Sequence, residues 1–185
     1  MRITIKAPLT IIFSVLAIVF YFTLQSTGPV PRVFVLHGDL QFENPLWYVS
    51  LVGYTMGHVS INHLVGNISL FLLLGHIIEK RYGTRRMFYM LTSTGAVTAL
   101  IHIALFDHKL IGASGLVFMM IVLSSLIDIR EKEVPISFIL IVLLFIGKEV
   151  VESFESDAVS QFAHIFGGVM GAFFGYRYKR EGIYR

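Results

Sequence analysis

The chain has 185 residues, of which 55% are hydrophobic and 15% charged, and its mean hydropathy is +0.74. This composition lies outside the usual range of soluble domains and indicates an integral membrane protein in a lipid bilayer. The absence of cysteine excludes a disulfide scaffold, thiol catalysis and thiolate metal sites. The formal net charge of +3 is too small to suggest nucleic acid as a partner.

Uncharged apolar runs long enough to cross about 30 Å of hydrocarbon predict membrane-spanning helices. Five such spans occur along the chain: 8–24, 59–78, 87–106, 110–127 and 158–176. One further run, 134–147, is short and becomes long enough if the charged side chains that follow it reach back to water. In chain order it is the fifth span, and 158–176 is the sixth. The first span has a basic flank like a signal peptide, but its exit has no small-x-small cleavage site, so we expect an anchor. The predicted fold is all-α: a polytopic membrane protein with six transmembrane helices, in which 1–185 forms one domain.

The Lys and Arg residues test this count, because cytoplasmic loops carry an excess of them. One side of the six-span arrangement takes twelve: Arg2, Lys6, Lys80, Arg81, Arg85, Arg86, Arg130, Lys132, Arg177, Lys179, Arg180 and Arg185. The other side takes three: Arg32, Lys109 and Lys148. Both termini are therefore predicted to be cytoplasmic.

The longest connection, 25–58, is rich in aromatic residues and is predicted to lie outside the cytoplasm. Trp and Tyr favour the headgroup region, since each pairs an apolar ring with a polar edge. The plainest interpretation is an interfacial loop in which residues such as Trp47 and Tyr48 act as anchors.

Polar side chains inside the spans carry the functional information, because burying them in lipid is costly. His63 and Asn67 lie near the start of the second span, Ser114 near the start of the fourth and His164 near the start of the sixth. All three spans run inward in the predicted topology, so at 1.5 Å per residue the four side chains lie roughly 6–12 Å below the outer surface. Three helices thus place polar side chains at the same depth in the membrane.

A lone Ser and a lone His at equal depth suggest a nucleophile activated by a general base. His63 and Asn67, at i and i+4, share one helix face and can donate hydrogen bonds to the oxyanion. The backbone N–H of Ser114 is a further donor, since the first amides of a helix lack internal partners. No carboxylate lies at this depth in the three spans, so we predict a dyad of Ser114 and His164 without a third member. We expect the ring of Phe118 to pack on the imidazole of His164 and to orient it.

Gly167 and Gly171 form a small-xxx-small face, extended by Gly175, that lets two helix backbones approach closely. We expect this face to pair the sixth span with the fourth. Each feature alone has a plainer explanation, since glycine, serine and buried histidine are common where membrane helices pack. The common depth of the polar side chains on the three spans is what favours catalysis. His76 and His102 belong to no such cluster and are interpreted as structural.

These residues resemble the rhomboid family of intramembrane serine proteases. The resemblance rests on three motifs: His58-x4-His63-x3-Asn67, Gly112-x-Ser114-Gly115, and Ala163-His164-x2-Gly167-x3-Gly171; the segment Glu79 to Gly83 is also similar. It implies Ser114 as nucleophile, His164 as base, and His63 with Asn67 as oxyanion donors. His58 would be a structural residue near the site.

The resemblance implies hydrolysis of peptide bonds in or near a transmembrane helix of a membrane protein substrate. The predicted topology opens the site to the extracytoplasmic side of the cell membrane. The resemblance implies no cofactor and no metal. Two positions depart from the family pattern. Phe118 stands where the family often has Tyr, and Trp47 and Tyr48 stand in place of a Trp-Arg pair.

Other classes lack the required residues. No His-Glu-x-x-His string is present for a metalloprotease, and an aspartyl protease would need two membrane-embedded Asp residues. The open alternative is a catalytically silent rhomboid-like protein that binds client helices, against which the presence of Ser114 and His164 argues. A transporter is weaker, since no inverted pair of broken helices is apparent.

Overall fold

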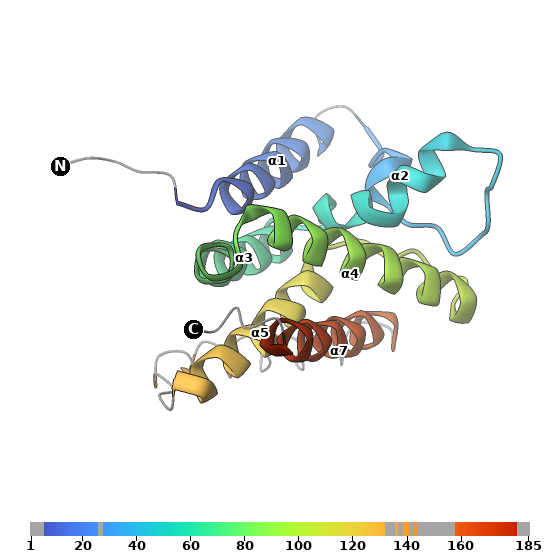
Figure 1. Cartoon of the computed structure of the whole chain (residues 1–185). Helices are drawn as coiled ribbons and strands as arrows, with labels where there is room; N and C mark the ends of the chain where they lie inside the picture. Colours follow the sequence, from blue (N-terminus) through green and yellow to red (C-terminus); the bar gives the residue numbers. More distant parts are fainter. Residues whose placement is uncertain are drawn as a thin grey trace.

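The computed structural model describes residues 6–25, 28–131 and 158–180, with single positions 136, 139, 140 and 143 between the last two ranges. Its elements are α1 (Pro8–Gln25), η1 (Arg32–Phe34), α2 (Pro45–Gly53), η2 (Tyr54–Met56), α3 (Ile61–Tyr82), α4 (Thr84–Leu105), α5 (Ser114–Glu131) and α7 (Ala158–Arg180). Figure 1 shows α4 running across the molecule, with α1 and α2 on one side of it and α5 and α7 on the other. The all-α prediction is therefore confirmed for the described residues.

Four of the six predicted spans, 8–24, 59–78, 87–106 and 158–176, lie within a few residues of α1, α3, α4 and α7. Among the described residues, only α3 and α4 are both long and apolar enough to cross a membrane; α1 and α5 contain shorter apolar stretches. The span 134–147 falls outside the described residues except at single positions. Six crossings therefore stay a prediction.

The start of the fourth span was placed too early at residue 110. Leu110 instead exchanges two backbone hydrogen bonds of 2.9 Å with Leu36, forming a β-bridge to the first loop. Two residues later Gly112 has φ +126, a conformation that side-chain-bearing residues rarely adopt and that a helix cannot contain. The helix consequently begins at Ser114.

The outer surface of the helices is apolar. Large hydrophobic side chains on four different helices are more than half exposed: Phe22 on α1, Val65 on α3, Phe88 on α4 and Ile165 on α7. Many polar side chains are buried instead, including Asn67, Glu79 and His102. This arrangement is unfavourable in water and suits a protein whose helices face lipid.

Glu79 connects the first helix to the rest of the bundle. Its side chain, on α3, is 2% exposed. Its carboxylate accepts hydrogen bonds from the backbone N–H groups of Leu9 (3.0 Å) and Thr10 (2.8 Å) and from the hydroxyls of Thr10 (2.7 Å) and Thr84 (2.8 Å). Two first-turn amides of α1, which lack acceptors within their own helix, are thus capped by a residue about 70 positions away.

The first loop is more ordered than an interfacial loop with projecting anchors. It contains α2, which begins after Asn44, whose side chain accepts a hydrogen bond from the Leu46 N–H. Trp47 is 5% exposed, and its indole N–H donates to the carbonyl of Asp39 at 3.1 Å. The ring of Trp47 therefore packs within the loop and does not project from it, whereas Tyr48 is exposed; the interfacial location of the loop stays a prediction.

Candidate active site

Ser114 is the first residue of α5 and is partly buried. The turn before it favours glycine because of its backbone conformation, and it is closely packed. Gly112 has φ +126, and a Cβ added there would lie 2.7 Å from Cε1 and 2.9 Å from Nε2 of His63. The imidazole of His63 therefore lies directly against the turn that carries Ser114, so the structure brings together two of the predicted site residues.

The predicted general base, His164, lies on α7. Its side chain is 7% exposed. The ring stacks on that of Phe118, with centroids 4.4 Å apart and planes at 12°. Phe118 lies one turn after Ser114 on α5, so the helix that carries the predicted nucleophile also supports the predicted base. The packing predicted between these two rings is confirmed.

Backbone contact between α5 and α7 holds these two residues near each other. A Cβ added at Gly115 would lie 3.1 Å from the carbonyl oxygen of Ala163. Gly115 directly follows Ser114 and Ala163 directly precedes His164, so the chain segments that carry the two predicted reacting groups are in van der Waals contact.

The glycines of α7 continue this contact along the helix. A Cβ added at Gly167 would overlap the carbonyl oxygen of Gly115, and one at Gly171 would overlap that of Met119 and approach Cβ of Val122 to 3.1 Å. α5 and α7 make the most extensive helix contact among the described residues. The predicted pairing of the fourth and sixth spans is therefore confirmed.

The donors predicted on α3 differ in their surroundings. Asn67 is 1% exposed, and its Nδ2 donates to the backbone carbonyl of His63, one turn earlier, at 3.1 Å. One of its two N–H groups is thus used within the helix, and the other is left for a further acceptor. The backbone N–H of His63 donates to the Ser60 side chain at 3.1 Å, which caps the start of α3.

His58 lies in the loop before α3, with its ring in an edge-on contact of 5.0 Å with that of His63. Burial, followed by the charge that His63 can carry, lowers the pKa of His58 to about 4. Its Nδ1 lies 3.2 Å from the carbonyl oxygen of Met56. Since a carbonyl can only accept, Nδ1 carries the proton of the neutral ring and fixes the tautomer.

The other histidines lie apart from this group. His102, on α4, is fully buried, and its Nε2 donates to the carbonyl of His108 at 2.8 Å. His76 is exposed on α3. Within the described ranges, no three His, Asp or Glu side chains are placed to hold a metal ion.

The sequence motifs did not reveal how the first loop supports the site. Gly57, just before His58, packs so closely that a Cβ there would overlap the carbonyl oxygen of Phe34. The N–H of Gly112 donates to the carbonyl of Tyr54 at 3.0 Å. These contacts join the first loop to the turn before Ser114, and only the clustering of glycines at such positions could have signalled them.

The fold and the site together define a helical membrane protein in which a serine and a histidine are carried on adjoining helices. Residues 45–181 match the rhomboid domain family, and the chain belongs to this family. Rhomboid proteins are integral membrane proteins, and they include serine intramembrane proteases.

Two relatives are informative. Rhomboid protease GlpG of Haemophilus influenzae is 21% identical over 177 residues, covering 92% of this chain and 91% of the relative. Rhomboid-related protein 1 of Caenorhabditis elegans is 30% identical over 159 residues, covering 79% of this chain. The chain spans only 43% of the length of the nematode protein.

Proposed function

We propose that this chain is an intramembrane serine endopeptidase that cleaves peptide bonds in or near the transmembrane helices of membrane protein substrates. The observation that carries the proposal is the contact between Gly115 and Ala163, the sequence neighbours of Ser114 and His164. Such a contact keeps a nucleophile and a base on separate helices within reach of each other. Membership of the rhomboid family supports the same reaction class.

In the proposed reaction, His164 accepts the hydroxyl proton of Ser114 as the serine oxygen attacks the substrate carbonyl carbon. The tetrahedral intermediate collapses with cleavage of the C–N bond, and the imidazolium gives its proton to the departing amine. Water, deprotonated by His164, then attacks the acyl-enzyme, releases the carboxyl product and restores Ser114.

The oxyanion formed in both halves of the reaction needs hydrogen-bond donors. The proposed donors are the ring of His63, which lies against Gly112, the backbone N–H of Ser114 and the remaining N–H of Asn67. The first amides of α5 have no acceptor within the helix, so the Ser114 N–H is suited to this role.

Orientation of the base is assigned to Phe118. A serine protease triad uses a carboxylate to hold the imidazole, whereas here the stacked ring of Phe118 supports it. Stacking restricts rotation of the imidazole and leaves both ring nitrogens at its edge.

The proposed setting follows from the distribution of positive charge. Both termini lie in the cytoplasm, the site opens toward the extracytoplasmic side, and residues 1–185 act as a single membrane domain. Substrate helices reach the site from the lipid bilayer and must unwind locally to expose a peptide bond. No cofactor takes part in these steps.

Covalent labelling tests the proposal directly. A fluorophosphonate probe should label the wild-type chain in detergent, whereas Ser114→Ala should remain unlabelled and His164→Ala should label at least a hundredfold more slowly, about the contribution of a general base. Cleavage of a transmembrane substrate should be lost in both variants and should survive a metal chelator. A folded wild-type protein that neither labels nor cleaves would instead be a silent binder of client helices.

A further inference from the structure

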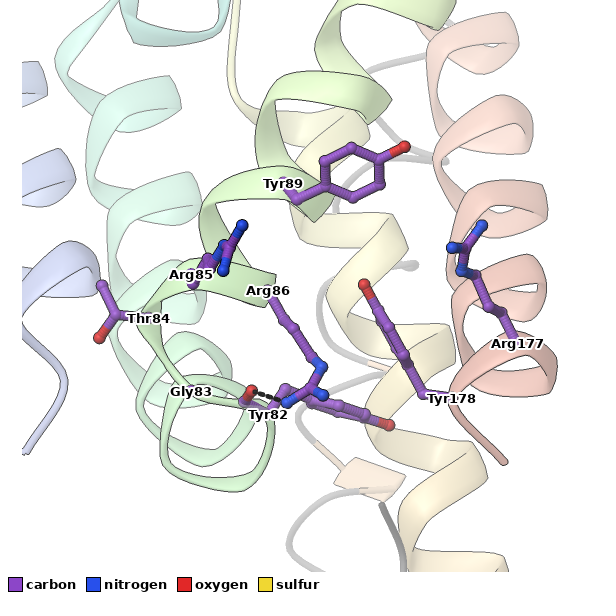
Figure 2. Close-up of a pocket in the computed structure, with 8 residues that line it drawn as sticks. All are labelled: Tyr82, Gly83, Thr84, Arg85, Arg86, Tyr89, Arg177 and Tyr178. Atoms are coloured by element: carbon purple, nitrogen blue, oxygen red, sulfur yellow. Dashed lines mark hydrogen bonds between the residues drawn. The ribbon is translucent and has the colours of Figure 1, made fainter. Parts of the chain in front are cut away.

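A hollow lies at the ends of the helices opposite to Ser114, where α3 turns into α4 and near the last residues of α7. It has a volume of about 710 Å³ and is lined by Tyr82, Gly83, Thr84, Arg85, Arg86, Tyr89, Arg177 and Tyr178. Figure 2 shows Arg86 and Tyr178 extending into the space between α4 and α7, with Arg177 on the α7 side and Arg85 on the α4 side. Neither Ser114 nor His164 lines this hollow.

Three of the described residues that line the hollow are arginines, and none of these described lining residues is acidic. Arg85 and Arg86 lie in the first turn of α4 and Arg177 in the last turns of α7, and neither helix contains an acidic residue. The acidic residue nearest in sequence to this turn, Glu79, is buried, and its carboxylate is occupied by donors from Leu9, Thr10 and Thr84. The hollow is therefore suited to an anion.

Arg86 is held in position by aromatic residues. Its Nη1 donates to the carbonyl of Tyr82 at 3.4 Å, and its Cζ lies 5.8 Å from the ring centre of Tyr178. The rings of Tyr82 and Tyr178 pack against each other at 5.4 Å, and both are almost completely buried. A guanidinium with these two contacts keeps further N–H groups for a ligand.

The start of α4 adds a second source of positive potential. Gly83 precedes the helix with φ +82 and has no side chain to cap it, and no side-chain hydrogen bond is made at this cap. The first amides of a helix lack internal acceptors and carry the positive end of its dipole. Phosphate groups bind at such positions, here beside the three arginines.

In the proposed topology, the hollow lies at the cytoplasmic surface of the membrane. α3 and α4 are the two described helices long and apolar enough to cross a membrane, and Gly83 joins them. Beside the hollow, Phe88 and Tyr89 are 57% and 55% exposed on the outer face of α4, where acyl chains can lie. Basic pockets between helices at this level bind phospholipid headgroups.

We propose that this pocket binds the phosphate of an anionic membrane phospholipid. Arg85, Arg86 and Arg177 surround the phosphate, and arginine suits this role because its planar guanidinium pairs with two phosphate oxygens at once. The lipid joins the end of α7 to the start of α4 and so stabilises the end of the bundle farthest from Ser114.

The test uses the full chain, purified in detergent and analysed by native mass spectrometry and thermal unfolding. Phosphatidylglycerol should bind about tenfold more tightly than phosphatidylcholine with the same acyl chains, since only the former carries a net charge. The double variant Arg85→Gln/Arg177→Gln should lower phosphatidylglycerol affinity by about thirtyfold, as expected for two surface arginines. Both side chains are exposed, so the fold should tolerate the change.

A charge-matched control, Arg32→Gln/Lys80→Gln, removes two exposed positive charges outside the pocket and should bind phosphatidylglycerol as the wild type does. Equal affinity of the pocket variant and the control would overturn the proposal. The second part of the experiment measures thermal unfolding with inorganic phosphate at millimolar concentration in place of the lipid. If it stabilises the wild type as much as phosphatidylglycerol, and the pocket variant loses both effects, the ligand is a free phosphate and the lipid assignment fails.

Discussion

The imidazole of His164 lies flat on the ring of Phe118, with centroids 4.4 Å apart and planes at 12°. Phe118 is one turn from Ser114 on α5, so the predicted nucleophile and the support of the predicted base belong to one rigid element. Removal of the ring should therefore affect turnover through the orientation of the base.

Phe118→Leu should lower kcat by about tenfold while KM changes little, because a tilted imidazole accepts the serine proton poorly. Phe118→Tyr keeps the ring and should retain most of the activity. Steady-state cleavage of a transmembrane substrate in detergent measures both. If Phe118→Tyr were as slow as Phe118→Leu, the stacked ring would not be what orients the base.

Asn67→Ala should lower kcat by roughly 10²-fold with little change in substrate binding, because an oxyanion donor acts on charge that appears in the transition state. Ser69→Ala, an exposed change on the same helix, serves as control and should be neutral. Weaker binding with unchanged kcat would show that Asn67 positions the substrate instead.

Two adjacent glycines of α7 provide a matched pair for the helix contact. A Cβ at Gly167 would overlap the carbonyl oxygen of Gly115, whereas one at Gly168 would meet Cγ2 of Val122 at an ordinary 3.6 Å. Gly167→Ala should therefore reduce thermal stability and lower kcat by roughly 10²-fold, since a shift of about 1 Å misplaces the base. Gly168→Ala should be close to wild type in both.

These measurements belong at temperatures where both variants are folded, as judged by circular dichroism. A fully active Gly167→Ala protein would mean that α5 and α7 can separate without cost to the reaction. Gly171→Val, two turns below His164, should share the defect because Met119 and Val122 leave no room for its side chain, whereas His102→Ala on α4 should not.

Glu79→Ala should destabilise the protein by about 2–4 kcal/mol, because buried donors of Leu9, Thr10 and Thr84 lose their acceptor. Glu79→Gln keeps one acceptor oxygen and should be intermediate. Thermal unfolding in detergent measures the difference, and Lys80→Ala, an exposed change at the next residue, should be nearly neutral. Equal melting temperatures for Glu79→Ala and Lys80→Ala would rule out this anchoring of α1.

The topology can be tested because the chain has no cysteine. A single cysteine in place of Lys109 should react with an impermeant thiol reagent in intact cells, while one in place of Arg85 should react only after the membrane is opened. Both positions are exposed. The reverse pattern would contradict the proposed orientation of the site.

Composition and spacing were sufficient to predict helices at α1, α3, α4 and α7 and the pairing of α5 with α7. These features are local or nearly so. Helix formation follows from apolar runs of sufficient length, and a row of glycines marks a close helix contact wherever its partner lies. The level of Ser114 relative to His164 could be estimated because rise per residue is constant.

Contacts between distant segments were decided only by the tertiary structure. In the sequence, Glu79 marks only the end of an apolar run. In the structure, its side chain caps the start of α1, about 70 residues away along the chain. The bridge between Leu36 and Leu110 moved the start of α5 from residue 110 to Ser114. By their positions in the sequence, Arg85 and Arg177 are ordinary charged residues at helix ends. They line one pocket only because α4 and α7 meet in the structure. Each depends on which buried donor finds which acceptor when the helices pack, a choice that no local pattern of hydrophobicity encodes.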